Sequence, residues 1–209
     1  MTSGQLGSAL LQTLGLIVLT YAGALMLGVL LAICRIAPVP PLRAAATAYV
    51  TVFRNVPLLV LLVLFTFGLP TVGLLVPLFY NAALAMALYW AAFICEVVRS
   101  GMRTVPRGQV EAARALGLTF GQSLRDVVLP QALRSMVQPL TNIFIGSALG
   151  TALAAAAGVP ELTFWYQQQA SQAGQPLTSF AVVTVIYVAI ALTAGLAAGR
   201  VERKVAISR

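Results

Sequence analysis

The passage EAARALGLTFGQSLRDVVLP, residues 111–130, is the polar exception in a chain that is otherwise rich in Leu, Ala and Val. The passage holds four charged residues, two glycines and a proline, whereas the whole chain of 209 residues is 60% hydrophobic and only 9% charged. Soluble globular domains contain about 25% charged residues. The composition therefore indicates a membrane protein, in which this passage is a loop between spanning helices.

Long apolar runs lie on both sides of this passage. A membrane-spanning helix needs about 20 apolar residues, because each residue rises about 1.5 Å and the hydrocarbon core is about 30 Å thick. The runs are continuous rather than alternating, which favours helices over the strands of a membrane barrel. A cleaved signal peptide is disfavoured, because the first run is long and no basic residue precedes it. We predict one transmembrane domain, residues 1–209, with spans at about 8–34, 44–67, 78–98, 131–157 and 177–199.

The positions of the basic residues predict the orientation in the membrane. The N-terminal tail and the segments near 68–77 and 158–176 contain no Lys or Arg, whereas such residues surround the segment 99–130 and the C-terminus. Short loops rich in Lys and Arg stay in the cytoplasm. We therefore expect the N-terminus outside, and the segment 99–130 and the C-terminus in the cytoplasm. Because topology accounts for the net charge of +8, no nucleic-acid partner is expected.

Several classes of function are excluded by what the sequence lacks. A P-loop is absent, and the one lysine, Lys204, lies near the C-terminus. There is no histidine, no G-x-S-x-G nucleophile and no cluster of metal ligands. The two cysteines, Cys34 and Cys95, are expected to be small buried side chains. We therefore expect neither catalysis nor a bound cofactor or metal in this chain, and if it transports a solute, the energy source lies on another chain.

The segment 99–130 predicts two short helices joined by a turn. Residues 109–116 are strong helix formers, and Gly117 tolerates the positive φ that ends a helix. Thr119 can cap the next short helix, and Pro130 suits the first turn of the span that follows. The first short helix has a face of small alanines and lacks the large apolar residues that would anchor it among lipid head groups. Docking to another protein is therefore favoured over an interfacial helix.

The spacing of the residues in this loop resembles the EAA loop of ABC importer permeases. The matching positions are Glu111, Ala112, Ala113, Gly117, Val127, Leu129 and Pro130. Other stretches, among them YVTVFRNVPLLVLL (49–62), FGLP (67–70) and GVPELT (158–163), are similar to permeases for polar amino acids. The resemblance implies an all-α, five-span, MetI-like permease of a type I importer in the bacterial plasma membrane.

The resemblance also implies partners and a mechanism. The partners are a second permease subunit, two ATPase subunits and an external solute-binding protein, and the substrate is glutamate, aspartate, glutamine or a basic amino acid. The chain would form the translocation path by alternating access and would couple to the ATPase through a short helix. The coupling residues implied are Arg107, Glu111, Ala112, Ala113, Arg114 and Gly117.

A substrate path through the membrane has weaker support in the sequence. Arg54 lies ten residues into the second predicted span, where a charge is costly unless it is paired or wetted. It either receives a substrate carboxylate, with Asn55 beside it, or it extends to the inner membrane surface or belongs to a structural ion pair. Glu96 either joins this site or pairs with Arg99 at i, i+3. Two further candidates in the fourth span, Asn142 and Thr151, either face a cavity or bond to their own helix.

One departure from the family pattern bears on the second permease. Many relatives carry K-D-T or K-N-T where this chain has the neutral Leu149, Gly150 and Thr151. This difference favours a homologous heterodimer in which the partner holds most of the ligand, with pairing of two identical chains as the alternative. A carrier or channel acting alone is a further alternative, but it predicts inverted repeats and ionisable relay residues inside the spans. Neither feature is evident in the sequence.

Overall fold

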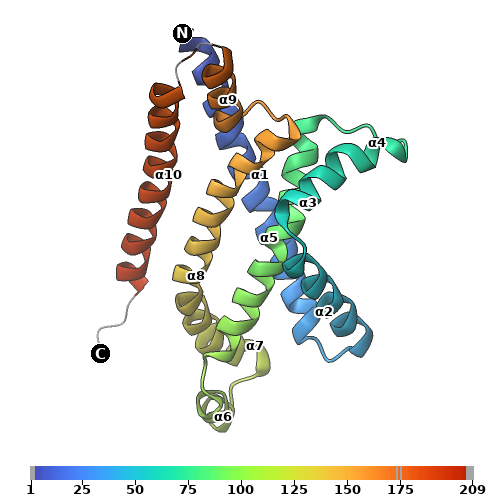
Figure 1. Ribbon diagram of the computed structural model, residues 1–209. Coiled ribbons are helices and arrows are strands. Elements are labelled where there is room, and N and C mark those ends of the chain that lie inside the picture. Colours follow the sequence, from blue (N-terminus) through green and yellow to red (C-terminus); the bar gives the residue numbers. More distant parts are fainter. Residues whose placement is uncertain (1–2, 173, 175, 206–209) are drawn as a thin grey trace.

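The chain is all-helical over the residues that the computed structural model describes, 3–172, 174 and 176–205 (Figure 1). The predicted all-α class is therefore confirmed. Most of the length lies in long helices, joined by short π-helical segments (η1, η2), a 3₁₀ segment (η3) and turns. The elements are α1 (Ser3–Ile36), α2 (Pro40–Asn55), α3 (Leu58–Val63), η1 (Leu64–Gly68), α4 (Leu69–Thr71), α5 (Leu78–Arg103), α6 (Arg107–Ala115), α7 (Phe120–Gln122), η2 (Ser123–Val128), α8 (Leu129–Gly150), η3 (Thr151–Ala157), α9 (Leu162–Gln172) and α10 (Pro176–Val205).

Four stretches of helix in the described chain are long and apolar enough to cross a membrane. They are Gly4–Ile36, Leu78–Arg103, Phe120–Ala157 and Pro176–Arg200. A fifth crossing exists if the bent pair Pro40–Asn55 and Leu58–Thr71 counts as one span. The structure thus contains four crossings, or five with the bent pair.

The predicted span at about 44–67 is not one straight helix, because the chain bends by 101° between α2 and α3. Val56, at the break, is extended, with φ −92° and ψ 131°. Pro57, which follows it, has no N–H to donate and disfavours helical geometry in the preceding residue. Hydropathy alone does not register this break, because Val and Pro do not interrupt an apolar run.

Helices α1 and α5 form the centre of the fold, and small residues let them approach closely. A Cβ added to Gly28 would lie 2.7 Å from the Cβ of Ile94, so only glycine fits there. Ala24, Ala32 and Ala92 are fully buried in the same contact region. The backbones are therefore close, as is common where helices pack inside a membrane.

The two ends of the molecule carry different segments (Figure 1). The first turns of α1 lie at one end together with α9, and α6 lies at the opposite end with the last turns of α10. Helix α1 thus begins at the end of the molecule opposite the charged loop. Below, the end that carries α6 is called the inner end and the other the outer end.

Candidate coupling helix and intramembrane polar site

Helix α6 stands in the loop where a coupling helix was expected, and Gly117 ends it. Gly117 has φ +80°, its N–H donates to the Arg114 carbonyl at 2.9 Å, and the Leu118 N–H donates to the Ala113 carbonyl at 3.1 Å. An added Cβ at Gly117 would meet nothing within 4 Å. The glycine is therefore required for its left-handed conformation rather than for lack of space.

The second short helix begins where the sequence predicts. Thr119 and Gln122 form a reciprocal cap, in which the Thr119 N–H donates to Gln122 Oε1 at 2.9 Å and the Gln122 N–H donates to Thr119 Oγ1 at 3.4 Å. Helix α7 is short and continues through η2 into α8, whose first turn contains Pro130. The predicted order of two short helices, a turn at Gly117 and a cap at Thr119 is thus confirmed.

The small alanines of α6 do not all face the same way. Ala113 is buried against the chain itself, whereas Ala112 and Ala115 are exposed. The charged candidates Arg107, Glu111 and Arg114 are also exposed. The structure thus brings these candidates onto one short helix, with Ala113 as its anchor and the others as its free surface.

Two large apolar side chains beside α6 were missed by the sequence reasoning. Leu116 is 82% exposed and Phe120 is 74% exposed, on either side of the Gly117 turn. Their signal in the sequence is their position, since they are apolar residues in an otherwise polar loop. The expectation that this helix lacks large apolar residues is therefore wrong for its C-terminal end. An exposed apolar patch with a charged rim marks a surface that contacts another protein or the membrane.

A polar cavity of about 330 Å³ lies at the break between α2 and α3. It brings Arg54 and Asn55 together with Glu96 from α5, as the sequence analysis allowed, and adds Arg35 from α1. Arg54 lies in the last turn of α2, beside the break and not in the middle of a continuous span. The remaining lining comes from Val50, Thr51 and Phe93.

Glu96 is the centre of an ion-pair network in this cavity. Arg35 donates a short hydrogen bond to its Oε1, and Arg99 donates to its Oε2 from Nη2 at 2.8 Å and from Nε at 3.2 Å. The i, i+3 pair of Glu96 with Arg99 is therefore present, but Arg35, from another helix, is a second partner. These bonds leave the carboxylate with little capacity for a further cation.

Arg54 is the loosely held member of this network. Its Nη1 lies 3.8 Å from Glu96 Oε1, its side chain is 47% exposed, and its guanidinium lies 5.6 Å from the centroid of the Phe93 ring. A cation over an aromatic face is held without using its N–H donors. Arg54 therefore has donors free to receive an anionic group that enters the cavity.

The other two candidates for the substrate path lie elsewhere. Asn142 is exposed on α8 and does not line the Arg54 cavity. Thr151 is buried, and its hydroxyl donates to the Ala148 carbonyl at 2.7 Å and lies 3.4 Å from the Tyr187 hydroxyl. Thr151 thus bonds to its own helix, which was one of the two readings that the sequence left open.

A buried carboxylate at the outer end was not singled out by the sequence reasoning. Glu161 is fully buried; it accepts a hydrogen bond from the Tyr187 hydroxyl at 2.7 Å and one from the Phe164 N–H at 2.9 Å. No Lys or Arg forms an ion pair with it in the described chain. Burial raises the pKa of Glu161. The available signal was a lone acid in a segment, 158–176, that contains no Lys or Arg.

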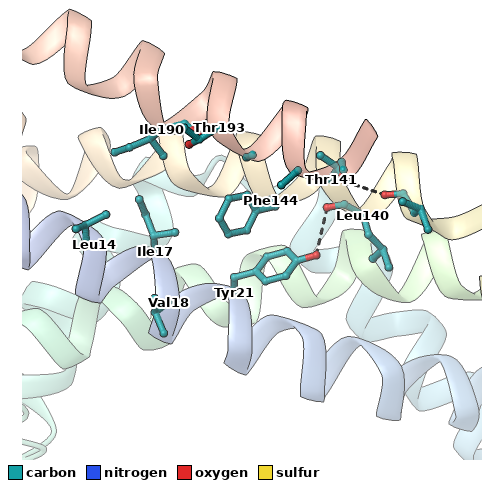
Figure 2. Close-up of a pocket in the computed structure, with 13 residues that line it drawn as sticks. Leu14, Ile17, Val18, Tyr21, Leu140, Thr141, Phe144, Ile190 and Thr193 are labelled. Carbon is teal, nitrogen blue, oxygen red and sulfur yellow. Dashed lines mark hydrogen bonds between the residues drawn. The ribbon is translucent and has the colours of Figure 1, made fainter. Parts of the chain in front are cut away.

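An apolar hollow of about 640 Å³ lies between α1, α8 and α10 (Figure 2). Figure 2 shows Tyr21 and Phe144 on its wall, with the Tyr21 hydroxyl donating to the Leu140 carbonyl at 3.2 Å. No charged residue lines it. The hollow is therefore unsuited to a zwitterion, and the Arg54 cavity is the better candidate for a polar solute.

The sequence matches the profile of the family described as "Binding-protein-dependent transport system inner membrane component" over residues 24–207. The chain belongs to this family. This permease is accordingly a multi-pass protein of the inner (plasma) membrane.

Curated relatives of the permease have names that refer to amino acids. The probable glutamine ABC transporter permease protein GlnM of Bacillus subtilis is 36% identical over 84% of this chain and 78% of its own length. The glutamate transport system permease protein GluC of Corynebacterium efficiens is 34% identical over 94% of this chain and 92% of its own length. The permease is thus similar to these proteins over most of its sequence.

Solved structures extend the similarity to the whole fold. A crystal structure of an amino acid ABC transporter with histidines superposes with a TM-score of 0.90 at 30% identity, over 97% of this chain and 94% of that one. An inward-facing structure of the methionine ABC transporter MetNI superposes with a TM-score of 0.79 at 28% identity, over 99% of this chain and all of that one. The expected MetI-like importer fold is confirmed.

Proposed function

We propose that the permease is the membrane subunit of an ATP-driven importer of polar amino acids, and that α6 seats in a groove of a separate ATPase subunit. The observation that carries this proposal is the surface of the charged loop. An exposed apolar tip, Leu116 and Phe120, stands beside the charged side chains of Arg107, Glu111 and Arg114 at the inner end. The stand-alone carrier or channel offers no use for such a surface.

The connections of α6 suit it to transmit movement. Only residues 104–106 separate it from α5. The Thr104 hydroxyl lies 2.7 Å from the Gly101 carbonyl and 3.1 Å from the Ser135 hydroxyl of α8. Gly101 packs so tightly that an added Cβ would lie 2.4 Å from Met136 Cγ. A displacement of α6 therefore moves α5 and α8 together, as rigid elements of a switch between two access states.

The Arg54 cavity is the proposed point of contact with the substrate. The relatives' names refer to glutamine, glutamate and arginine. These amino acids all have an α-carboxylate, which a guanidinium binds through paired hydrogen bonds. Asn55 adjoins Arg54 at the open side of the cavity, and Glu96 holds Arg35 and Arg99 in place. Asn142, exposed on α8, is proposed to line the path further along, and Thr151 is assigned a structural role.

The proposed assembly contains further chains. Two ATPase subunits bind ATP and Mg, an external binding protein delivers the amino acid, and this chain catalyses no reaction itself. A homologous second permease is preferred to a second copy, because Leu149, Gly150 and Thr151 offer few polar groups for a ligand. The lipid membrane covers the remaining apolar surface.

The coupling role is tested by Gly117→Trp and by Glu111→Lys in the reconstituted importer. We expect amino acid uptake per ATP hydrolysed to fall at least about tenfold, equivalent to about 1.4 kcal/mol of coupling free energy. The reason is that each change alters the surface of the loop that is proposed to bind the ATPase. The measurement is uptake and ATPase turnover in the same vesicles, with the amount of permease determined by quantitative blotting.

Gly73→Trp is the matched control, since Gly73 also has a positive φ, +82°, is open on the side of a Cβ and lies between α4 and α5, outside the charged loop. It should leave the ratio of uptake to hydrolysis unchanged. If both α6 variants transport as the unsubstituted protein does, the docking role of this helix is wrong.

A further inference from the structure

A strongly cationic hollow of about 480 Å³ lies at the inner end, between α1, α2 and α5. Four of its lining residues are arginines and none is acidic. The hollow adjoins the Arg54 cavity and shares Arg35 with it. The residues that line it are Arg35, Ile36, Arg43, Thr47, Arg99, Met102 and Arg103.

The charges around this hollow are not balanced by the described chain. Glu96 pairs with Arg35 and Arg99, whereas neither Arg43 nor Arg103 forms an ion pair with a described carboxylate. Arg43 Nη2 donates to the Ala37 carbonyl at 3.3 Å, which orients the guanidinium without neutralising it. Four positive groups thus face one negative group, and a cleft lined by one sign of charge attracts the opposite sign.

The surface next to the cationic hollow is apolar. Ile36 and Met102 belong to its wall. On the same corner of α1 and α2, Ile33 is 59% exposed, Val39 is 43% exposed and Leu42 is 47% exposed. A cationic site with an apolar border matches an anionic amphiphile, whose charged head and hydrocarbon tail need both surfaces at once. A soluble anion would use the arginines alone.

We propose that this hollow binds the headgroup of an anionic phospholipid from the leaflet at the inner end. Arg43 and Arg103 bind the phosphate, Arg35 and Arg99 form a wall that Glu96 holds in place, and the acyl chains lie along Ile33 and Leu42. Basic pockets between membrane helices are suited to such head groups. The bound lipid joins the corner of α1 and α2 to the end of α5, a short connection away from α6. Membrane composition would in this way influence coupling.

The test measures lipid binding by the purified complex of the permease with its ATPase. The complex is stripped of lipid in mild detergent and titrated with phosphatidylglycerol, and bound lipid is counted by native mass spectrometry. We expect one phosphatidylglycerol per permease to persist, and Arg43→Gln/Arg103→Gln to weaken its binding by about thirtyfold, since each arginine near a lipid headgroup contributes about a fivefold factor.

Two control variants separate a specific site from general charge. Arg125→Gln/Arg200→Gln removes the same charge from two exposed arginines outside the hollow, and it should retain the bound lipid. Arg43→Lys/Arg103→Lys keeps the charge and should retain most of the binding, which also shows that the hollow tolerates substitution. Equal loss of lipid in the Arg125 and Arg200 variant would overturn the proposal.

Two further arms distinguish other occupants of the hollow. Inorganic phosphate at millimolar concentration should not displace the lipid; if it binds with the same dependence on Arg43 and Arg103 while the lipid does not, the site serves a soluble anion and the proposal is wrong. The cysteine of Arg43→Cys should react with a polar thiol reagent after the lipid is removed from the complex. Crosslinking of that cysteine to the ATPase instead would overturn the proposal, because the hollow would then be a protein interface.

Discussion

Arg54 shows how the surroundings of a single residue decide its chemistry. A charged residue ten positions into an apolar run is expensive in a continuous span, but the break at Pro57 places Arg54 at a helix end with its side chain 47% exposed. The Phe93 ring and Glu96 stabilise the guanidinium without occupying all its donors. The residue therefore combines a tolerable position with free hydrogen-bonding capacity.

Replacing Arg54 by alanine is expected to raise the KM of uptake by about tenfold to a hundredfold, the range for losing one charge-assisted hydrogen bond to a substrate carboxylate. Arg54→Lys should show a smaller effect, since a lysine keeps the charge but not the paired donors. Uptake of radiolabelled amino acid by the reconstituted importer provides the measurement, with Arg125→Ala as the control. Unaltered uptake kinetics in Arg54→Ala would remove this residue from the substrate path.

At the scale of elements, the buried Glu161 connects the outer helix α9 to its neighbours. Its carboxylate accepts from Tyr187 of α10 and from the first turn of α9, and the Leu162 N–H donates to Thr13 of α1 at 3.1 Å. These bonds satisfy buried polar groups that would otherwise cost about 1–3 kcal/mol each. Helix α10 packs on α8 and α9, and the hydrogen bond from Tyr187 to Glu161 links its outer half to the start of α9.

The raised pKa of Glu161 predicts a pH dependence of stability. The folded protein binds this proton more tightly than the unfolded chain, so the contribution is complete below the ordinary carboxyl pKa of about 4.3 and is lost as pH rises through the raised value. Glu161→Gln, which stays neutral, should remove this decline. Thermal unfolding of the detergent-solubilised protein across acidic and neutral pH provides the measurement.

Tyr187→Phe deletes one donor to the same carboxylate and should lower stability at neutral pH by about 1–3 kcal/mol. Tyr80→Phe, at a tyrosine that is 57% exposed, is the matched control. For Glu161, the prediction of a raised pKa is contradicted if the stability of the wild-type protein depends on pH in the same way as that of Glu161→Gln.

At the scale of the whole molecule, the chain leaves large apolar surfaces uncovered. Only 11% of the apolar window in α10 is buried, against 50% for α5. Exposed apolar surface of this extent faces lipid or another subunit. In the assembly proposed above, a second permease and the membrane would share that surface, and the loop at the inner end would meet the ATPase.

Vesicles that contain this chain alone are therefore expected to accumulate no amino acid, because the force that switches its helices comes from other subunits. Adding the ATPase, the binding protein and a homologous permease should restore uptake that depends on ATP. Uptake by the isolated chain would contradict the importer, and a functional complex with two identical permeases would contradict the heterodimer. Subunit masses from the purified complex distinguish the last two cases.

Much of the architecture could be predicted because it depends on local features. Helix type follows from apolar length, and the end of α6 follows from the need for a positive φ at Gly117. The capping box of Thr119 with Gln122 depends on a spacing of three residues. Such features need no knowledge of distant segments, so they could be recognised before the fold was known.

The parts that could not be predicted depend on which distant residues meet. Helix packing decides that Arg35 of α1 binds Glu96, that Tyr187 binds Glu161, and that Arg43 and Arg103 share one hollow. The residues of these pairs lie 26 to 61 positions apart in the sequence. The sequence by itself determined an all-helical membrane protein with a polar coupling loop, because hydrophobic length and turn chemistry are local. Only the tertiary structure decided the environment of each charge, because burial and ion pairing arise when helices far apart in the chain are brought into contact.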